Sequence, residues 1–346
     1  MFEPKFNITS KLLENIKRIS VIVANLNNRH FSKLTLVKLE KTAREVSSHS
    51  STSIEGNPLL LTDVKKIIKN RPENLRDSEK EVINYNQALE VLDADIRNNS
   101  TIFSLDLILK TQKAVTSELI NDFNSGKIRQ QPVFVNDPIT RKVIYLPPDH
   151  KDVKSLLDDL IKYITSNKNQ IDPLILAGIF HKQFVTIHPF IDGNGRTARL
   201  ITKVLLADMG LSTFNLFSFE NYYNQYNQNV SKYFENIGIR GNYYDLEDQI
   251  DFTSWLEYFT DGIIDELLRV IKILNSETIS PETSLKPYHH KILDFIKKND
   301  FIADHDYAKL TNRAKPTRNK DFNKLIELGL IERFGKGKAT YYKLKD

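Results

Sequence analysis

The feature that most constrains this 346-residue chain is a polar turn between two apolar segments. Residues 188–199 read HPFIDGNGRTAR, and they separate the apolar runs 173–187 and 200–209. Both runs have the composition of buried helices, so the turn is expected between two core helices of a mainly helical fold. Gly193 and Gly195 allow positive φ angles and a close approach of the backbone to a ligand.

The same turn has the chemistry of an anion-binding site. A helix that starts here presents unpaired backbone N–H groups and the positive end of its dipole, a combination that binds phosphate. Arg196 and Arg199 are three residues apart, so they share a helix face and can both reach a polyphosphate. Asp192 offers Mg²⁺ a hard oxygen ligand beside phosphates, and His188 is a candidate general base. The alternative is a capped helix with solvated side chains, but a cap requires neither two glycines nor two arginines.

At these residues the chain resembles the Fic (Fido-fold) family, whose signature is His-x-Phe-x-Asp/Glu-Gly-Asn-Gly-Arg-x-x-Arg. Residues 188–199 match it at every fixed position, and the resemblance extends over about residues 34–274. It implies an enzyme that transfers AMP from ATP to a Ser, Thr or Tyr hydroxyl of a protein, itself included. His188 would then be the catalytic base and Asp192 would hold Mg²⁺. The implied phosphate contacts are Asp192, Gly193, Asn194, Gly195, Arg196, Thr197, Ala198 and Arg199.

A segment rich in serine and threonine, residues 47–53, precedes Gly56. Serine and threonine are indifferent helix formers and Gly56 is a stop signal, so the pattern predicts a helix that frays along this segment. The family resemblance adds a second interpretation, because Ser51 to Gly56 match its inhibitory motif Ser/Thr-x-x-x-Glu-Gly/Asn. Ser51 and Glu55 would then be inhibitory, and Glu55 would pair with Arg199 where the ATP γ-phosphate must sit. A further alternative is a deAMPylase in which Glu55 orients a water molecule that removes AMP.

Residues 126–149 break the helical pattern. Two runs of β type, 133–135 and 143–146, flank a turn that contains proline and predict a β-hairpin. The hairpin is either a purely structural element or, by the resemblance, a flap over the active site that pairs with an extended target segment. The resemblance also implies nucleotide contacts at Glu55, Val133, Phe134, Val135, Asn136 and Tyr233.

Basic charge is concentrated at the C-terminal end of the chain. Residues 285–346 contain 12 Lys and 3 Arg against 6 Asp and 2 Glu, a net charge of +7, whereas the whole chain carries +5. Three short helical patterns and two strand patterns occur there in the order typical of a winged helix-turn-helix. Its third helix would turn Arg318, Asn319, Lys320, Asn323 and Lys324 outward, which suits phosphate contact. The sequence does not decide whether this module binds DNA or protein. The second candidate function of the chain is therefore a DNA-binding regulator whose Fic domain senses nucleotide.

The predicted organisation is an N-terminal helical region with the inhibitory motif at 1–95, a Fic domain at 96–275, a linker at 276–287 and a winged-helix domain at 288–346. The chain has no cysteine, which excludes disulfides, a thiol nucleophile and a zinc–thiolate site. No run of about 18 apolar residues and no signal peptide is apparent, so a cytoplasmic protein without membrane contact is expected. The target protein and homodimerisation are left open.

Overall fold

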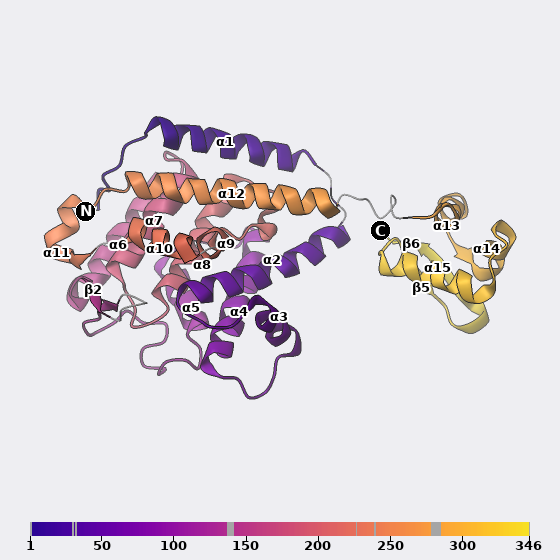
Figure 1. Ribbon diagram of the computed structural model, residues 1–346, viewed down its shortest axis with the longest axis horizontal. Coiled ribbons are helices and arrows are strands. Elements are labelled where there is room, and N and C mark those ends of the chain that lie inside the picture. Colours follow the sequence, from indigo (N-terminus) through magenta and orange to yellow (C-terminus); the bar gives the residue numbers. More distant parts are fainter. Residues whose placement is uncertain are drawn as a thin grey trace. The chain divides into compact units, whose positions relative to one another are not determined.

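The structure is a computed structural model that describes residues 2–29, 31, 33–136, 142–225, 227–238, 240–277 and 285–345. It is mainly helical, as predicted, and its chain divides into two compact units (Figure 1). One unit comprises Met1–His30 with Leu39–Ile271, and the other comprises Phe31–Lys38 with Lys272–Asp346. Residues 137–141 of the predicted hairpin and 278–284 of the predicted linker lie outside the described residues.

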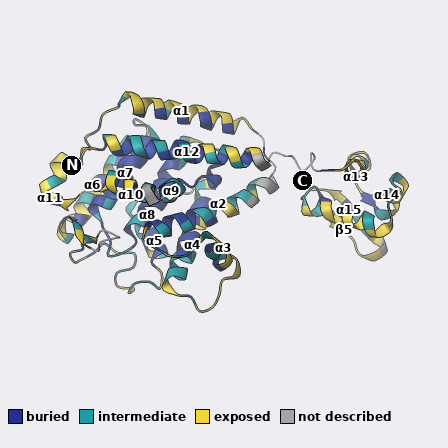
Figure 2. Ribbon diagram, in the orientation of Figure 1, coloured by how far each residue is buried: buried dark blue, intermediate teal, exposed yellow. Residues whose placement is uncertain are grey.

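The larger unit is built on helices α7 (Pro173–Ile187) and α8 (Asn194–Leu206). Of their residues, 13 of the 15 in α7 and 12 of the 13 in α8 are buried, and Figure 2 shows both in the interior. Helix α7 is mostly apolar, and a helix of that kind has to be surrounded by other elements. Asp172 caps α7 through the Leu174 amide, and Pro173 occupies the first turn, where its missing N–H costs nothing. The predicted pair of core helices is therefore present.

Other helices surround this pair. They are α1 (Ser10–Asn27), α2 (Lys33–Ile54), α3 (Leu61–Asn70), α4 (Asp77–Arg97), α5 (Leu105–Val115), α6 (His150–Asn167), α9 (Glu220–Asn224), α10 (Asn227–Ile237), α11 (Tyr243–Leu246) and α12 (Thr253–Glu277). Helix α1 lies along α12, where Asn15 donates to Thr260 at 3.0 Å and Lys11 pairs with Asp261 at 2.8 Å (Figure 1). No helix among the described residues combines the length and apolarity needed to cross a membrane.

Helix α2 corrects one sequence prediction. The serine-rich segment does not fray: the helix continues through it to Ile54. Several of its hydroxyl groups are buried and hydrogen-bonded, since Ser47 donates to Glu220 at 2.6 Å and Thr52 donates to the Ser48 carbonyl at 2.9 Å. The buried Ser50 hydroxyl has no partner among the described residues. Gly56, with φ of 95°, follows the end of the helix. Tertiary hydrogen bonds thus override weak helix propensity in this segment.

The predicted hairpin is present as β1 (Val135–Asn136) and β2 (Val143–Leu146), which pair antiparallel. A third strand that was not predicted, β3 (Gly241–Asn242), pairs parallel with β2. The Tyr145 hydroxyl donates to the Thr186 carbonyl on α7 at 2.9 Å, which ties the hairpin to the core helix. Within the described residues β1 has a neighbour on one side only, so its outer edge is open.

The second unit contains the elements predicted for a winged helix, in the predicted order. They are α13 (Pro287–Asn299), α14 (Asp304–Leu310), α15 (Lys315–Glu327), β5 (Ile331–Phe334) and β6 (Tyr341–Leu344), with an additional strand β4 (Ile302–Ala303) paired to β6. Ile292, Tyr307 and Phe322 are fully buried in its core. Arg318 departs from the prediction: it does not point freely outward but makes a two-pronged pair with Asp304 at 2.8 and 2.9 Å.

Candidate active site

The turn between α7 and α8 has a fixed backbone. His188 ends α7 in the left-handed conformation, with φ of 51°, and Gly193 begins α8 with φ of 78°. A Cβ on Gly193 would lie 2.8 Å from the Thr116 side chain, so a larger residue does not fit there. The Asn194 side chain accepts from the Phe190 amide and donates to the Phe190 carbonyl, both at 2.9 Å. Asn194 therefore uses its side chain to close the turn, and only its backbone amide remains for a phosphate.

His188 has the tautomer of a general base. Its Nδ1 lies 3.2 Å from the Val185 carbonyl, which can only accept, so Nδ1 carries the proton and Nε2 has the free lone pair. Burial lowers the pKa of His188 below its ordinary value of 6.5, against opposing contributions from Val185 and Glu55. The ring is therefore neutral near pH 7 and can take a proton at Nε2.

The first turn of α8 is an anion-binding position. The first amide bonded within the helix is that of Thr197, which donates to the Gly193 carbonyl at 2.9 Å, so the preceding amides have no acceptor in the helix. The Glu55 carboxylate lies directly against Gly195: a Cβ built on this glycine would be 2.9 Å from Glu55 Cδ. A carboxylate of the chain itself therefore occupies the positive end of α8.

Arg199 holds that carboxylate in place. Its guanidinium is fully buried and donates to Glu55 Oε1 at 2.8 Å, to Ser51 Oγ at 2.7 Å and to the Ser51 carbonyl at 2.8 Å. Burial disfavours the charged form, but Glu55 and the hydroxyls of Tyr233 and Tyr85 outweigh it, and the pKa of Arg199 lies above its ordinary value. The structure thus pairs Glu55 with Arg199, as the family resemblance implied, and adds Ser51 as a further partner of Arg199.

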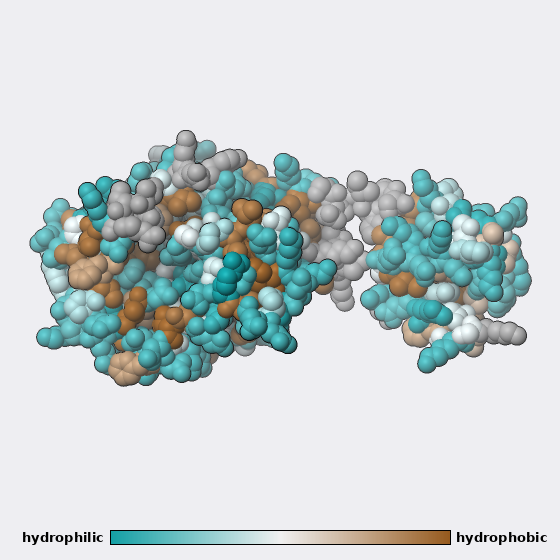
Figure 3. Space-filling view, turned by 60° about the horizontal axis from the view of Figure 1, so that its bottom comes forward, coloured by the Kyte–Doolittle hydropathy of each residue, from teal (hydrophilic) through white to brown (hydrophobic). Residues whose placement is uncertain are grey.

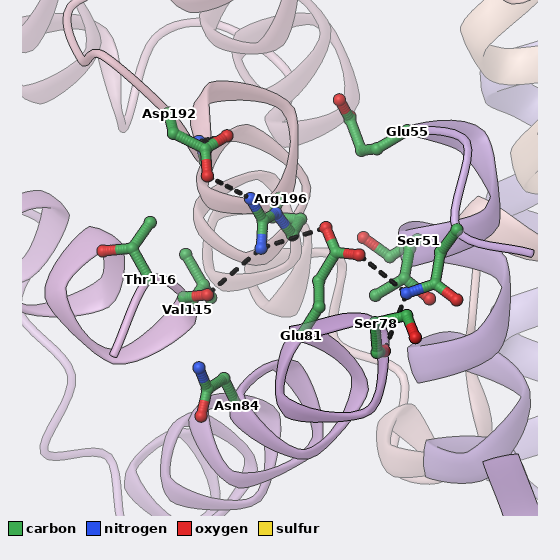
Figure 4. A network of polar contacts seen from close by, with 12 residues as sticks. Ser51, Glu55, Ser78, Glu81, Asn84, Val115, Thr116, Asp192 and Arg196 are labelled. Carbon is green, nitrogen blue, oxygen red and sulfur yellow. Dashed lines mark hydrogen bonds and ion pairs between the residues drawn. The ribbon is translucent and has the colours of Figure 1, made fainter. Parts of the chain in front are cut away.

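Arg196 points toward Asp192 and Glu81 (Figure 4). Arg199, in contrast, contacts Ser51 and Glu55. The Arg196 guanidinium is 4% exposed and pairs with Asp192 Oδ2 at 2.9 Å and with Glu81 Oε1 at 3.0 Å. It also donates to the Val115 carbonyl at 3.2 Å. Both signature arginines are therefore paired with carboxylates, and Arg196 orients Asp192 instead of facing a phosphate.

Glu81, on α4, pairs with Arg196 but was not identified as a site residue from the sequence. Its second oxygen accepts from Asn57 Nδ2 at 2.7 Å, and the same amide donates to the Ser78 carbonyl at 2.8 Å (Figure 4). Burial raises the pKa of Glu81, while Arg196 and Asn57 act in the opposite direction. Because Asn57 lies two residues after Glu55, this network connects the segment that carries Glu55 to Arg196.

A cavity of about 280 Å³ opens beside His188 and Glu55. Six predicted site residues line it, namely Glu55, Val135, Asn136, His188, Gly195 and Tyr233. Eight further lining residues were not identified as site residues: Ile54, Ile144, Tyr145, Val185, Thr186, Phe234, Ile237 and Gly238. Tyr233 is buried, and burial raises its pKa to about 12, so its hydroxyl is a neutral hydrogen-bonding group.

Other predicted site residues lie outside this cavity. Thr197 and Ala198 are on the fully buried side of α8, and Val133 and Phe134 precede β1 without lining the cavity, Phe134 being 60% exposed. A larger cavity of about 810 Å³, beside Phe214, is lined by none of the predicted site residues.

Asp192 is the residue that could hold a metal ion. Its Oδ1 accepts from the Gly193 amide at 2.6 Å and Oδ2 from Arg196, and its side chain is 47% exposed. The described residues contain no cluster of three or more potential metal ligands. Magnesium is commonly bound by one or two carboxylates together with substrate phosphates, so one exposed carboxylate beside a phosphate position fits this ion.

Comparisons with known proteins agree with this geometry. The model of the Fic/DOC family matches residues 102–206. A protein adenylyltransferase Fic from Aedes aegypti is 26% identical over 220 residues, covering 58% of this chain and 42% of the relative. One from Nematostella vectensis is 28% identical over 166 residues, covering 47% of this chain and 37% of the relative. The chain thus spans less than half the length of these curated relatives.

Solved structures share the fold. A Fic family protein from Desulfovibrio desulfuricans has a TM-score of 0.67 at 19% identity, covering 99% of this chain and 98% of the other. Fic-1 from C. elegans has a TM-score of 0.60 at 19% identity, covering 77% and 73%. The signature turn and the helix pair that holds it thus lie within residues 102–206, which match the Fic/DOC family model, and the chain shares its fold with these solved structures.

Proposed function

We propose that this chain is an auto-inhibited protein adenylyltransferase that transfers AMP from ATP to a Ser, Thr or Tyr hydroxyl of a protein, its own chain included. The observation that carries the proposal is the cavity that His188 lines together with Gly195 in the first turn of α8, where the Glu55 carboxylate occupies an anion position. The printed name of the curated relatives, protein adenylyltransferase Fic, supports the reaction class.

The chemistry asked of the residues is alignment, proton removal and charge neutralisation. His188 Nε2 accepts the proton of the target hydroxyl, whose oxygen forms a bond to the α-phosphorus of ATP. The bond between that phosphorus and the oxygen of the leaving diphosphate breaks, which gives an AMP ester and diphosphate. Amides of the first turn of α8 and the Arg199 guanidinium offset the phosphate charge.

Asp192 is the residue that would hold Mg²⁺ together with the nucleotide phosphates. When bound, the ion would supply positive charge next to the phosphates. The role of Arg196 in this proposal is indirect, since its pair with Asp192 at 2.9 Å keeps that carboxylate oriented toward the turn.

Inhibition is assigned to Glu55 and Ser51: Glu55 pairs with Arg199, and Ser51 contacts the same guanidinium through its hydroxyl and its carbonyl. A carboxylate and a phosphate compete for the same guanidinium and the same helix N-terminus, so ATP can dock fully only when Glu55 leaves Arg199. The open edge of β1 next to the cavity is suited to strand addition by an extended target segment.

Intact-protein mass spectrometry of a Glu55→Gly variant incubated with ATP and Mg²⁺ tests the proposal. A gain of one AMP on the variant itself, located by peptide mapping, is the expected result. The matched control is Glu55→Gly with His188→Ala, which should bind nucleotide and gain nothing. Pre-labelled protein that loses AMP only when Glu55 is present would instead favour the deAMPylase, and no change in either direction would refute the proposed activity.

A DNA-binding role of the second unit is the other candidate, favoured by the exposed basic side of α15. Asn319, Lys320, Asn323 and Lys324 are exposed there, and the face of this unit seen in Figure 3 is mostly hydrophilic. We propose that these residues contact DNA phosphates. A gel shift that weakens steeply with salt and is lost in a Lys320→Glu, Lys324→Glu variant is expected, and binding unaffected by both changes would exclude this surface.

A further inference from the structure

Arg129 lies beside the catalytic turn and uses its guanidinium on backbone carbonyls alone. Arg129 is buried, with 3% of its surface exposed. Its Nε donates to the His188 carbonyl at 2.8 Å, one terminal nitrogen to the Gln131 carbonyl at 3.2 Å and the other to the Pro148 carbonyl at 2.6 Å. In the part of the chain that the structure describes, no carboxylate forms an ion pair with it.

Burying the Arg129 charge without a carboxylate partner costs stability, so the side chain is expected to have a structural or functional role. Burial indeed lowers the pKa of Arg129, with Asp149 acting in the opposite direction. Three donors in one rigid plane can, however, fix three separate pieces of backbone at once. The three carbonyls therefore indicate what Arg129 holds together.

Two of these carbonyls belong to the ends of the flap. Gln131 lies shortly before β1 and Pro148 shortly after β2, so Arg129 joins both roots of the hairpin. The third carbonyl belongs to His188, whose positive φ of 51° is unfavourable for a residue with a side chain and has to be held by its surroundings. The Arg129 amide adds a 3.0 Å bond to the Pro189 carbonyl.

We propose that Arg129 is a positioning residue that locks the His188 backbone and both roots of the flap into one frame, so that a hydroxyl presented by the flap meets Nε2. This inference rests on the proposed function, because it assigns a substrate-presenting role to the flap. Misplacement of a reacting group by about 1 Å can cost about 100-fold in rate, so a frame of this kind contributes directly to turnover.

The charge of Arg129 has a second effect on the same histidine. The charged groups that act on His188 are Arg129, Glu55 and Asp192: Arg129 lowers the pKa of the imidazole, whereas the two carboxylates raise it. Arg129 therefore helps to keep Nε2 unprotonated as well as in place, and the two effects can be separated by substitution.

The experiment uses the full chain with Glu55→Gly, to which Arg129→Lys or Arg129→Met is added. Lysine keeps the charge, but its donors sit on a single nitrogen and cannot replace a fork whose three nitrogens reach three separate carbonyls. Methionine keeps the approximate length but has neither the charge nor the donors. Arg269→Lys is the control, because Arg269 is a half-buried arginine that contacts Glu266 and the Leu216 carbonyl, and within the described residues none of its hydrogen bonds or ion pairs reaches the turn. Measurements are kcat for self-modification, its pH profile, and the NMR titration of the His188 ring in the nucleotide-free protein.

Arg129→Lys should lower kcat about 10- to 100-fold with the titration midpoint of His188 unchanged. Arg129→Met should lower kcat at least as far and also move that midpoint to higher pH, and the control should change neither. Parental kcat in folded Arg129→Lys protein overturns the inference. If Arg129→Met does not fold, the kcat of Arg129→Lys decides. If the Glu55→Gly parent transfers nothing, the proposed function fails, while the ring titration still tests the contact of Arg129 with His188.

Discussion

Removing the carboxylate that pairs with Arg199 should strengthen nucleotide binding by a calculable amount. The Glu55–Arg199 pair has an N–O distance of 2.8 Å, with an Arg199 side chain that is 0% exposed and a Glu55 side chain that is 34% exposed. Two charges with centres about 4 Å apart interact by about 4 kcal/mol at an effective dielectric constant of about 20. Solvent exposure of Glu55 reduces this value to about 2 kcal/mol. This is the interaction energy that ATP must overcome to displace Glu55 from Arg199.

A difference of about 2 kcal/mol corresponds to about 30-fold in affinity. Isothermal titration calorimetry should therefore give a Kd for ATP with Mg²⁺ that is about 30-fold lower in Glu55→Gly than in the wild type. Glu55→Gln, which keeps the bulk of the side chain and removes its charge, should show most of this gain. AMP, which has no terminal phosphate to compete with the carboxylate, should gain much less. Equal ATP affinity in all three proteins, or an equal gain for AMP, would refute the reasoning.

Further predictions concern His188 and the network around Glu81. In the Glu55→Gly background, His188→Ala should abolish AMP transfer while the Kd for ATP stays the same, which calorimetry and mass spectrometry check together. Because burial lowers the pKa of His188 and only the neutral ring accepts a proton, kcat/KM should fall as pH decreases, with a midpoint below 6.5; a midpoint above this value would contradict the lowered pKa of His188. Asn57→Ala removes bonds to Glu81 and the Ser78 carbonyl, so urea unfolding should show a loss of about 2–3 kcal/mol. A loss below about 0.5 kcal/mol would show that this network does not hold the segment.

The central helices and the turn could be predicted because their signals are local. An apolar run with an aspartate cap and a proline in its first turn specifies α7, and the glycines of the turn can adopt angles that other residues avoid. The pairing of Glu55 with Arg199 was predictable only through the family resemblance, since the two residues are 144 positions apart in the chain.

The remaining features depend on contacts that no local pattern encodes. The serine-rich end of α2 is helical because distant residues bind its hydroxyls: Glu220 accepts a hydrogen bond from Ser47, and Arg199 donates one to Ser51. Arg196 was expected to face phosphates, but Glu81 and Asp192 hold it elsewhere, and nothing near Glu81 in the sequence marks it as a partner. Strand β3 has two residues, too few to give a β pattern of its own.

The most direct test of the account is a crystal structure of Glu55→Gly protein with Mg²⁺ and an ATP analogue that cannot release diphosphate. The account predicts the phosphates at the first-turn amides of α8, with Arg199 on the terminal phosphate, Asp192 beside the metal ion and His188 Nε2 facing the α-phosphorus. A nucleotide bound elsewhere, such as the larger cavity beside Phe214, or an imidazole turned away from the α-phosphorus, would contradict it.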